Sequence, residues 1–201
     1  MNKDSDMGKL YAESGWKHER EGDCDLAVSS LKTAIEHGYD PVRGYTDIAR
    51  IYSDRGLFDE AVRELKESLK KIPGSPEIHR ELGRAYYGLG KYREAMTEYA
   101  IVLESDQDNQ EASSEISKIC MKLGDFSIVS ELGNVSGMLH AGIGAMCEKK
   151  GDYPSAVREL EKAIDKGFSS CEVYMRLGRS LRETGDSAGS TESFKKAGEA
   201  G

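Results

Sequence analysis

The 201-residue sequence is poor in aromatic residues, prolines and cysteines, and it contains no long apolar run. Aromatic residues make up 7% of the chain, and there are only four prolines and four cysteines. The cysteines form no Cys-x-x-Cys pair, so we do not expect a disulfide framework or a two-pair zinc site. We expect free thiols in a cytoplasmic protein. No segment approaches the roughly 18 apolar residues of a membrane span, and the opening MNKDSDMGKL has no apolar core typical of a secretory signal.

Positive charge is also in deficit, since 28 Lys and Arg face 36 Asp and Glu, for a net charge of −8. Nucleic-acid binding needs a concentrated basic surface, so this class of function is disfavoured. Apolar residues amount to 38% of the chain and charged residues to 32%. This low apolar fraction suits an elongated array better than a compact globule, because a thin body buries less of its surface.

Glycines recur at a fixed spacing, which is the dominant feature of the sequence. Four steps of 34 residues and one of 27 separate six glycines, in the order 34, 34, 34, 27 and 34: Gly22, Gly56, Gly90, Gly124, Gly151 and Gly185. We number positions relative to these turn glycines. Small residues recur at offsets −7 and +5, and large residues at −11, −4 and +9. Such spacings place each set on one helical face, so each repeat is predicted to be two antiparallel helices joined by a glycine turn.

Helix boundaries are predicted by capping residues that agree with this period. Asp40 and Ser75 each precede a proline, which is typical of a helix start. Gly38 and Gly167 follow apolar-periodic segments, which is typical of a helix end.

The second and third repeats carry the fullest pattern, and it resembles the tetratricopeptide repeat. The second reads Tyr45-x-x-Ile48-Ala49-x-x-Tyr52-x-x-x-Gly56-x-Phe58-x-x-Ala61-x-x-x-Leu65. The resemblance implies an all-α, right-handed superhelical solenoid of six antiparallel helix pairs, with the fourth truncated. We expect a tail at residues 1–7 and repeats at 8–41, 42–75, 76–109, 110–136, 137–170 and 171–201. The alternative is the longer, less regular Sel1-like repeat, which the segments AIEHG and AIDKG favour.

The stretch GDFSIVSELGNVSG, residues 124–137, breaks the period. Seven missing residues are close to two helical turns, so helical phase is nearly kept while length is lost. We expect a first helix at about 110–122 and a second one shortened to about 126–133, since Gly133, Asn134 and Gly137 disfavour helix. Three interpretations stay open: a short but stacked helix, a hinge between two blocks of repeats, or a ligand site.

Catalytic and cofactor motifs are absent from the sequence, including HExxH, GxSxG and the phosphate-binding loop. His18, His79 and His140 take offsets of the repeat core, so we expect packed histidines and not metal ligands. Cys120 and Cys147 take the −4 offset, where a small apolar residue fits. We therefore expect no enzymatic activity, no cofactor and no metal.

The first helix of each repeat is expected to line a concave groove, with offsets −13, −10, −6 and −3 facing the ligand. Over these 24 positions eight residues are basic and five are acidic, opposite in sign to the whole chain. The candidate peptide-binding residues are Arg43, Arg50, Arg80, Arg84, Tyr87, Lys118, Met121, Arg179 and Arg182. Stacked arginines can grip a carboxylate with two hydrogen bonds, so we expect a protein or peptide partner, acidic in character. In the alternative, the arginines pair with nearby carboxylates such as Asp47, Asp54, Glu77 and Glu81.

Two further expectations concern partners. One subfamily clamps the acidic C-terminal tails of heat-shock chaperones with Lys, Asn and Arg, but the matching places here carry Ala12, Trp16, Asp47, Glu77 and Glu81. That clamp is therefore absent from the first three repeats, and in the last two only Arg176 could match. The last repeat could instead seal a homo-oligomer with its outer flank, or that flank could be solvated by polar residues such as Ser187, Ser190, Glu192 and Ser193.

Overall fold

The computed structural model describes residues 3–125, 127–132 and 136–200. These residues form eleven α-helices, one 3₁₀ helix (η1) and no strand, which confirms an all-helical repeat fold. In chain order the elements are α1 (Lys3–Glu21), α2 (Cys24–Glu36), α3 (Pro41–Asp54), α4 (Phe58–Lys71), α5 (Pro76–Gly88), α6 (Tyr92–Ser105), α7 (Gln110–Leu123), η1 (Ser127–Leu132), α8 (Gly137–Lys150), α9 (Tyr153–Asp165), α10 (Cys171–Glu183) and α11 (Ser187–Glu199).

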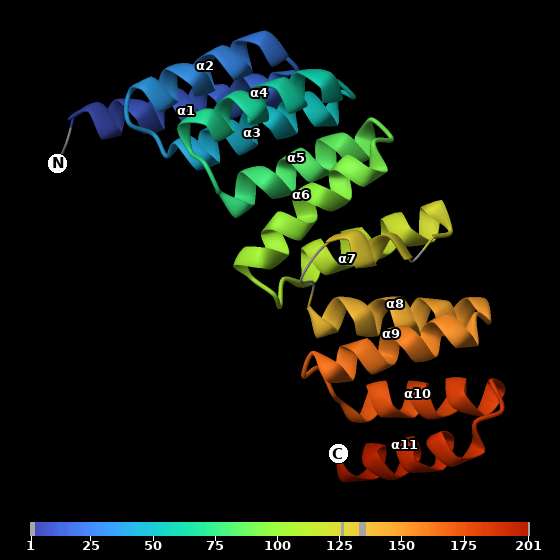
Figure 1. Cartoon of the computed structure of the whole chain (residues 1–201). Coiled ribbons are helices and arrows are strands. Elements are labelled where there is room, and N and C mark those ends of the chain that lie inside the picture. The colour runs from blue at the N-terminus through green and yellow to red at the C-terminus, as the bar shows by residue number, and fades with distance from the viewer. Residues whose placement is uncertain (1–2, 126, 133–135, 201) are drawn as a thin grey trace. The chain divides into compact units, whose positions relative to one another are not determined.

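The chain divides into two compact units, Met1–Val102 and Leu103–Gly201, and the division falls within α6. In unit 1 the helices follow one another as antiparallel pairs, α1 with α2 and α3 with α4, and α5 packs on α3 and α4 (Figure 1). In unit 2, α8 pairs with α9 and α10 with α11, while α9 and α10 pack on each other (Figure 1). We call the successive helix pairs repeats 1 to 6, with α7 and η1 as repeat 4.

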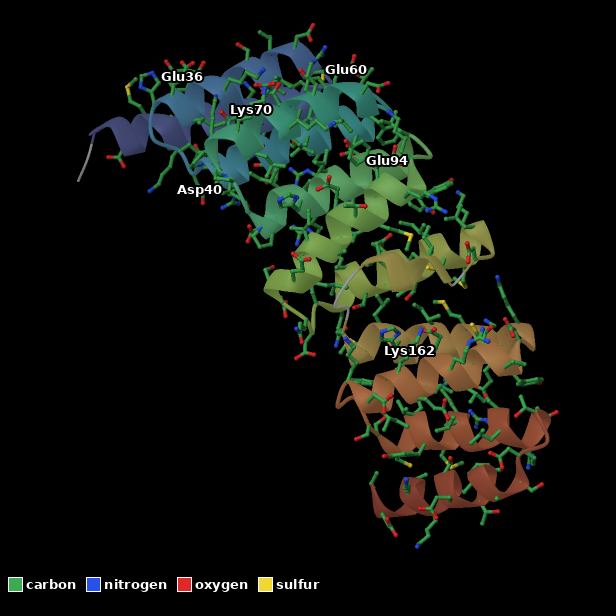
Figure 2. All side chains as sticks on the ribbon, viewed as in Figure 1. Glu36, Asp40, Glu60, Lys70, Glu94 and Lys162 are labelled. Carbon is green, nitrogen blue, oxygen red and sulfur yellow. The ribbon has the colours of Figure 1, made fainter. Side chains whose placement is uncertain are left out.

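Helix ends form where the sequence predicts them. All six turn glycines adopt positive φ, between 71° and 90°, a region that glycine enters without steric cost. Asp40, labelled in Figure 2, caps α3 by accepting hydrogen bonds from the backbone N–H groups of Val42 and Arg43. Ser75 caps α5 in the same way, and Gly38 and Gly167 follow their helices with φ of 83° and 81°.

In repeats 1, 3, 5 and 6 the two helices approach closely because glycine at offset −7 faces a large residue at +9. A Cβ atom on Gly83 would lie 3.0 Å from the Tyr99 ring, and one on Gly144 would lie 2.6 Å from Leu160 Cγ. Tyr99 and Leu160 are fully buried. The pairing of small and large residues predicted from the offsets is therefore present in the core of these four repeats.

The first helix is longer than expected, because α1 begins at Lys3 and includes residues 3–7 of the predicted tail. Gly8 explains this extension. A Cβ atom there would lie 2.7 Å from both His37 O and Tyr39 N, so glycine allows the early turns of α1 to lie against the end of α2.

Within the stretch 124–137, residues Ser127–Leu132 form a 3₁₀ helix, η1, where the sequence predicted a shortened second helix at about 126–133. A 3₁₀ helix rises about 2.0 Å per residue against 1.5 Å in an α-helix, so it spans more length with few residues. Ile128 and Val129 are buried, and α7 packs directly on α8 within unit 2. This packing supports the stacked interpretation over a hinge at this point. Phe126, Gly133 and Asn134 lie outside the described residues.

The polar face predicted for the last helix needs a correction. Ser190 and Ser193 are 5% and 6% exposed, and their hydroxyls donate to Gly178 O and Gly189 O, both at 2.8 Å. The same offsets, +5 and +8, are also buried in repeat 5, at Ala156 and Glu159. Ser187 and Glu192 are exposed as expected.

Candidate functional site

Two histidines predicted to pack in the core each bridge the two helices of their repeat. His79 Nδ1 lies 2.7 Å from Glu98 Oε2, and His140 Nδ1 lies 2.7 Å from Glu159 Oε2. Burial alone would raise the pKa of Glu159, but hydrogen bonds from His140 and Lys162 outweigh it and hold that pKa below its usual value. These histidines are therefore packed and hydrogen-bonded between the two helices of their repeats, as the offsets predicted.

The cysteines are free thiols in different surroundings. Burial raises the pKa of Cys120 to about 12 and that of Cys147 to about 11, so neither thiol is a nucleophile near neutral pH. Cys24 is half-buried and Cys171 is exposed. Within the described residues, no group of three or more His, Cys, Asp and Glu side chains could hold a metal ion. Nor does that part of the chain contain a helix of the length and apolarity needed to cross a membrane.

Basic residues at offset −6 of repeats 2 to 4 pair with acidic residues at −9 of the same helix. Arg50 Nη2 lies 3.1 Å from Asp47 Oδ1, and Arg84 Nη1 lies 3.4 Å from Glu81 Oε1. In unit 2, Lys118 Nζ lies 2.6 Å from Glu115 Oε1. The pairs that the alternative reading anticipated at Asp47 and Glu81 are therefore present.

Unit 1 also joins two of its candidate residues through Trp16. The indole N–H donates to Asp47 Oδ2 at 3.0 Å, and Arg43 stacks 5.5 Å above the indole ring. Asp47 is 7% exposed, so it holds Trp16 and Arg50 together across repeats 1 and 2. Farther along, Arg80 Nε lies 3.6 Å from Glu81 Oε1.

The count of charged groove residues made from the sequence covered offsets −13, −10, −6 and −3 and left out offset −9. That offset contributes four carboxylates and one arginine: Glu13, Asp47, Glu81, Glu115 and Arg176. Once it is included, acidic and basic groove positions are equal in number. The positive bias is therefore local and not a property of the whole groove.

Repeats 5 and 6 depart from the neutral pairs of repeats 2 to 4. Repeat 5 has Gly142 and Ala145 at offsets −9 and −6, and repeat 6 has Arg176 and Arg179. An open cleft of about 580 Å³ lies here between α8 and α10, in unit 2. Its lining residues are Gly142, Ala145, Met146, Glu148, Lys149, Tyr153, Arg176, Arg179, Arg182 and Glu183.

Glu148 fixes two arginines of this cleft. Arg176 Nη1 lies 2.7 Å from its Oε2 and Arg179 Nε lies 2.8 Å from its Oε1. Burial would raise the pKa of Glu148, but these two hydrogen bonds outweigh it and hold the pKa below its usual value. Lys149 is exposed, as is Arg182, whose Nε lies 4.0 Å from Glu183 Oε1. The lining has four cationic side chains and two carboxylates, a net charge of +2.

The candidate residues thus fall into two sets. Unit 1 contains Arg43, Arg50, Arg80, Arg84 and Tyr87, and unit 2 contains Lys118, Met121, Arg179 and Arg182. Tyr87 packs edge-on against Tyr92 at 5.4 Å, and Met121 is 42% exposed. Only Arg179 and Arg182 line the cleft, and sequence reasoning missed Lys149, Met146 and Tyr153 beside them. One sequence feature could have located the cleft: repeat 6 has an arginine, Arg176, at offset −9, where the other repeats have an acidic residue or glycine.

The comparisons with known proteins concern both sequence and fold. Two family models, each described as tetratricopeptide repeat, match residues 13–76 and 52–119, and together they span more than half of the chain. A tetratricopeptide repeat protein of Parabacteroides merdae has 19% identity and a TM-score of 0.54, over 97% of this chain and 80% of its own. The first tetratricopeptide domain of Spaghetti (RPAP3), bound to the HSP90 peptide SRMEEVD, has 26% identity and a TM-score of 0.52, over 60% of this chain and 98% of its own.

The human RPAP3 domain gives the same identity and TM-score, over 60% of this chain and 94% of its own. The phase-locked glycine turns, the small-to-large helix packing and the two family matches agree. This chain belongs to the tetratricopeptide repeat family.

Proposed function

We propose that this protein is a non-enzymatic, cytoplasmic interaction scaffold that binds an acidic segment of a partner protein along the first helices of its repeats. Members of the family are typically interaction modules without enzymatic activity. The observation that carries the proposal is the cleft between α8 and α10, where Arg179 and Arg182 line a surface of net positive charge in an acidic protein.

The proposed ligand differs from that of the chaperone-binding subfamily. The Spaghetti (RPAP3) domain binds an HSP90 peptide, but the places that match that subfamily's clamp carry Ala12, Trp16 and three carboxylates here. At these places Asp47 and Glu81 balance the charges of Arg50 and Arg84, and Glu77 adds a negative charge. The anchor of an acidic ligand is therefore better placed at the basic residues of unit 2.

A peptide-display selection tests this function. A random peptide library is selected on the wild-type protein and on an Arg179→Glu/Arg182→Glu variant of equal helicity. We expect peptides rich in Asp and Glu on the wild type, released by added salt because exposed charges are screened, and no such enrichment on the variant. Enrichment of peptides without acidic residues, or equal enrichment on both proteins, would refute the acidic-ligand assignment.

A second candidate function, self-association through the repeat ends, rests on Leu10. This side chain is 65% exposed at offset −12, where Ile78, Leu139 and Val173 are buried. The opposite flank offers no apolar match, since α11 exposes Thr191 and Gly198 at offsets where earlier repeats have aliphatic residues or Met. Sedimentation equilibrium of wild type and Leu10→Glu decides the point. A dimer lost in the variant would support self-association, and a monomeric wild type would exclude it.

A further inference from the structure

We infer that the cleft between α8 and α10 selects a segment in which an apolar side chain lies next to carboxylates. This inference rests on the proposed function and narrows it to one anchor and one class of ligand. The anchor has an apolar floor on α8 and a cationic rim on α8 and α10.

The floor is unusual because α8 has almost no polar face. Between Gly137 and Cys147 it contains no Asp, Glu, Lys or Arg. The groove-facing residues of this segment are small or apolar, and Gly142, Ala145 and Met146 line the cleft half-buried. Small side chains let a ligand approach the helix closely, and the thioether of Met146 adapts to differently shaped apolar groups.

The rim supplies cations that are held in place. Glu148 binds both Arg176 and Arg179, and Arg176 also bonds Glu172 through Nη2 at 2.7 Å. Arg176 therefore holds the Glu148 carboxylate in place and is not assigned to the ligand. Arg179, through its remaining guanidinium N–H groups, and the exposed Lys149 and Arg182 can meet a ligand carboxylate.

Repeats 2 to 4 offer no equivalent anchor. Each carries a basic residue at −6 that is already paired with a carboxylate at −9, as in Arg50–Asp47, Arg84–Glu81 and Lys118–Glu115. In each of these pairs the cation and the carboxylate balance in charge, whereas the lining of the cleft has four cations and two carboxylates. In repeat 5 both members of the pair are replaced by Gly142 and Ala145, which removes the carboxylate together with its cation.

Charge complementarity identifies the occupant as part of a partner protein with acidic character. A purely acidic segment would leave the floor of Gly142, Ala145 and Met146 uncovered. A purely apolar segment would leave the cations of the rim unused and desolvated. A segment that alternates the two kinds of residue satisfies both surfaces.

The test uses two fluorescein-labelled peptides of about ten residues, a length of about 33 Å when extended. The mixed probe has Leu or Met at every third position among Asp and Glu, and the acidic probe has Ser at those positions. Fluorescence anisotropy gives the dissociation constants. We expect the mixed probe to bind the wild type at least about 10-fold more tightly than the acidic probe, since burial of one Leu provides that factor.

Variants separate the floor from the rim. Ala145→Leu fills the floor and is expected to reduce binding of the mixed probe to the level of the acidic one, whereas Ser53→Leu, at the groove of repeat 2, is expected to change nothing. Lys149→Glu/Arg182→Glu is expected to weaken the mixed probe about 10-fold or more. The matched reversal Arg50→Glu/Arg84→Glu is expected to leave it unchanged, with Gln replacements used if that variant loses helicity.

Each outcome decides between the inference and the function beneath it. Equal binding of both probes with a loss only on charge reversal in the rim would keep the proposed function and overturn the apolar floor. A loss in the Arg50/Arg84 variant alone would overturn the placement of the anchor. The absence of saturable binding of either probe below about 1 mM would overturn both.

Discussion

Gly142 and Gly144 lie on the same helix, α8, but the space around them differs. We therefore predict opposite effects on stability when each is replaced by alanine. A Cβ atom on Gly142 would lie 3.6 Å from Ser117 Oγ, an ordinary contact. A Cβ atom on Gly144 would lie 2.6 Å from Leu160 Cγ and 3.3 Å from Leu160 N. Replacing Gly by Ala inside a helix stabilises by about 1 kcal/mol, whereas overpacking a buried contact costs about 1–3 kcal/mol.

We therefore expect Gly142→Ala to raise the free energy of unfolding by about 1 kcal/mol. The free energy of unfolding of Gly144→Ala should be about 2 kcal/mol lower than that of Gly142→Ala. For a chain of this length that difference corresponds to roughly 6 °C in the thermal midpoint, measured by circular dichroism at 222 nm. Leu160→Ala in the Gly144→Ala background should cost less than in the wild type, because the truncation relieves the overlap. A Gly144→Ala midpoint equal to or above that of Gly142→Ala would refute the close-approach reasoning.

Two other predictions follow from burial and ionisation. Under native conditions near neutral pH, a maleimide should modify exposed Cys171 first and leave Cys120 and Cys147 unmodified, because burial raises the pKa of both. Peptide mass mapping checks this order. Rapid labelling of Cys120 in the folded protein would contradict it. Glu159 has a lowered folded-state pKa despite its burial, so its ionised form stabilises the fold above the unfolded-state value of about 4.3 and this contribution is lost as the pH falls through the folded-state value. Glu159→Gln should accordingly be less stable than the wild type near neutral pH, with the difference in thermal midpoint shrinking in acid; a constant difference over the titration would exclude the linkage.

The repeat architecture could be predicted from the sequence because local signals and packing agree. The turn glycines, the proline-preceded caps at Asp40 and Ser75 and the glycines at offset −7 each have one favourable backbone or packing solution. The period alone located the truncated repeat. Its 3₁₀ geometry could not be predicted, since it depends on how much length the chain must span before Ser136 caps α8.

The candidate site was predicted less completely, because the groove-facing residues were taken from offsets −13, −10, −6 and −3 alone. Offset −6 identified Arg50, Arg84 and Arg179 as alike, but their surroundings differ. Asp47 and Glu81 neutralise the first two, whereas Glu148 positions the third beside another arginine. A pairing three residues away on the same helix decides whether a groove arginine is available, and only a reading of −9 together with −6 contains that information.

The histidine–glutamate bridges, partly buried in repeat 3 and buried in repeat 5, bear on how such repeats can change. Each bridge joins offset −11 to offset +8 at the same distance of 2.7 Å. In repeats 1 and 6 the same two positions hold Tyr11 with Ser30 and Tyr174 with Ser193. A single replacement within a bridge leaves a polar group without its partner unless another side chain takes that place. Repeat 2 holds the intermediate combination, Tyr45 with Glu64, in which Lys71 donates to the Tyr45 hydroxyl and Lys32 to the Glu64 carboxylate. Each residue of the pair can therefore change alone where a lysine of a neighbouring helix supplies the missing partner, so a bridge is transplanted together with its lysines and not by itself.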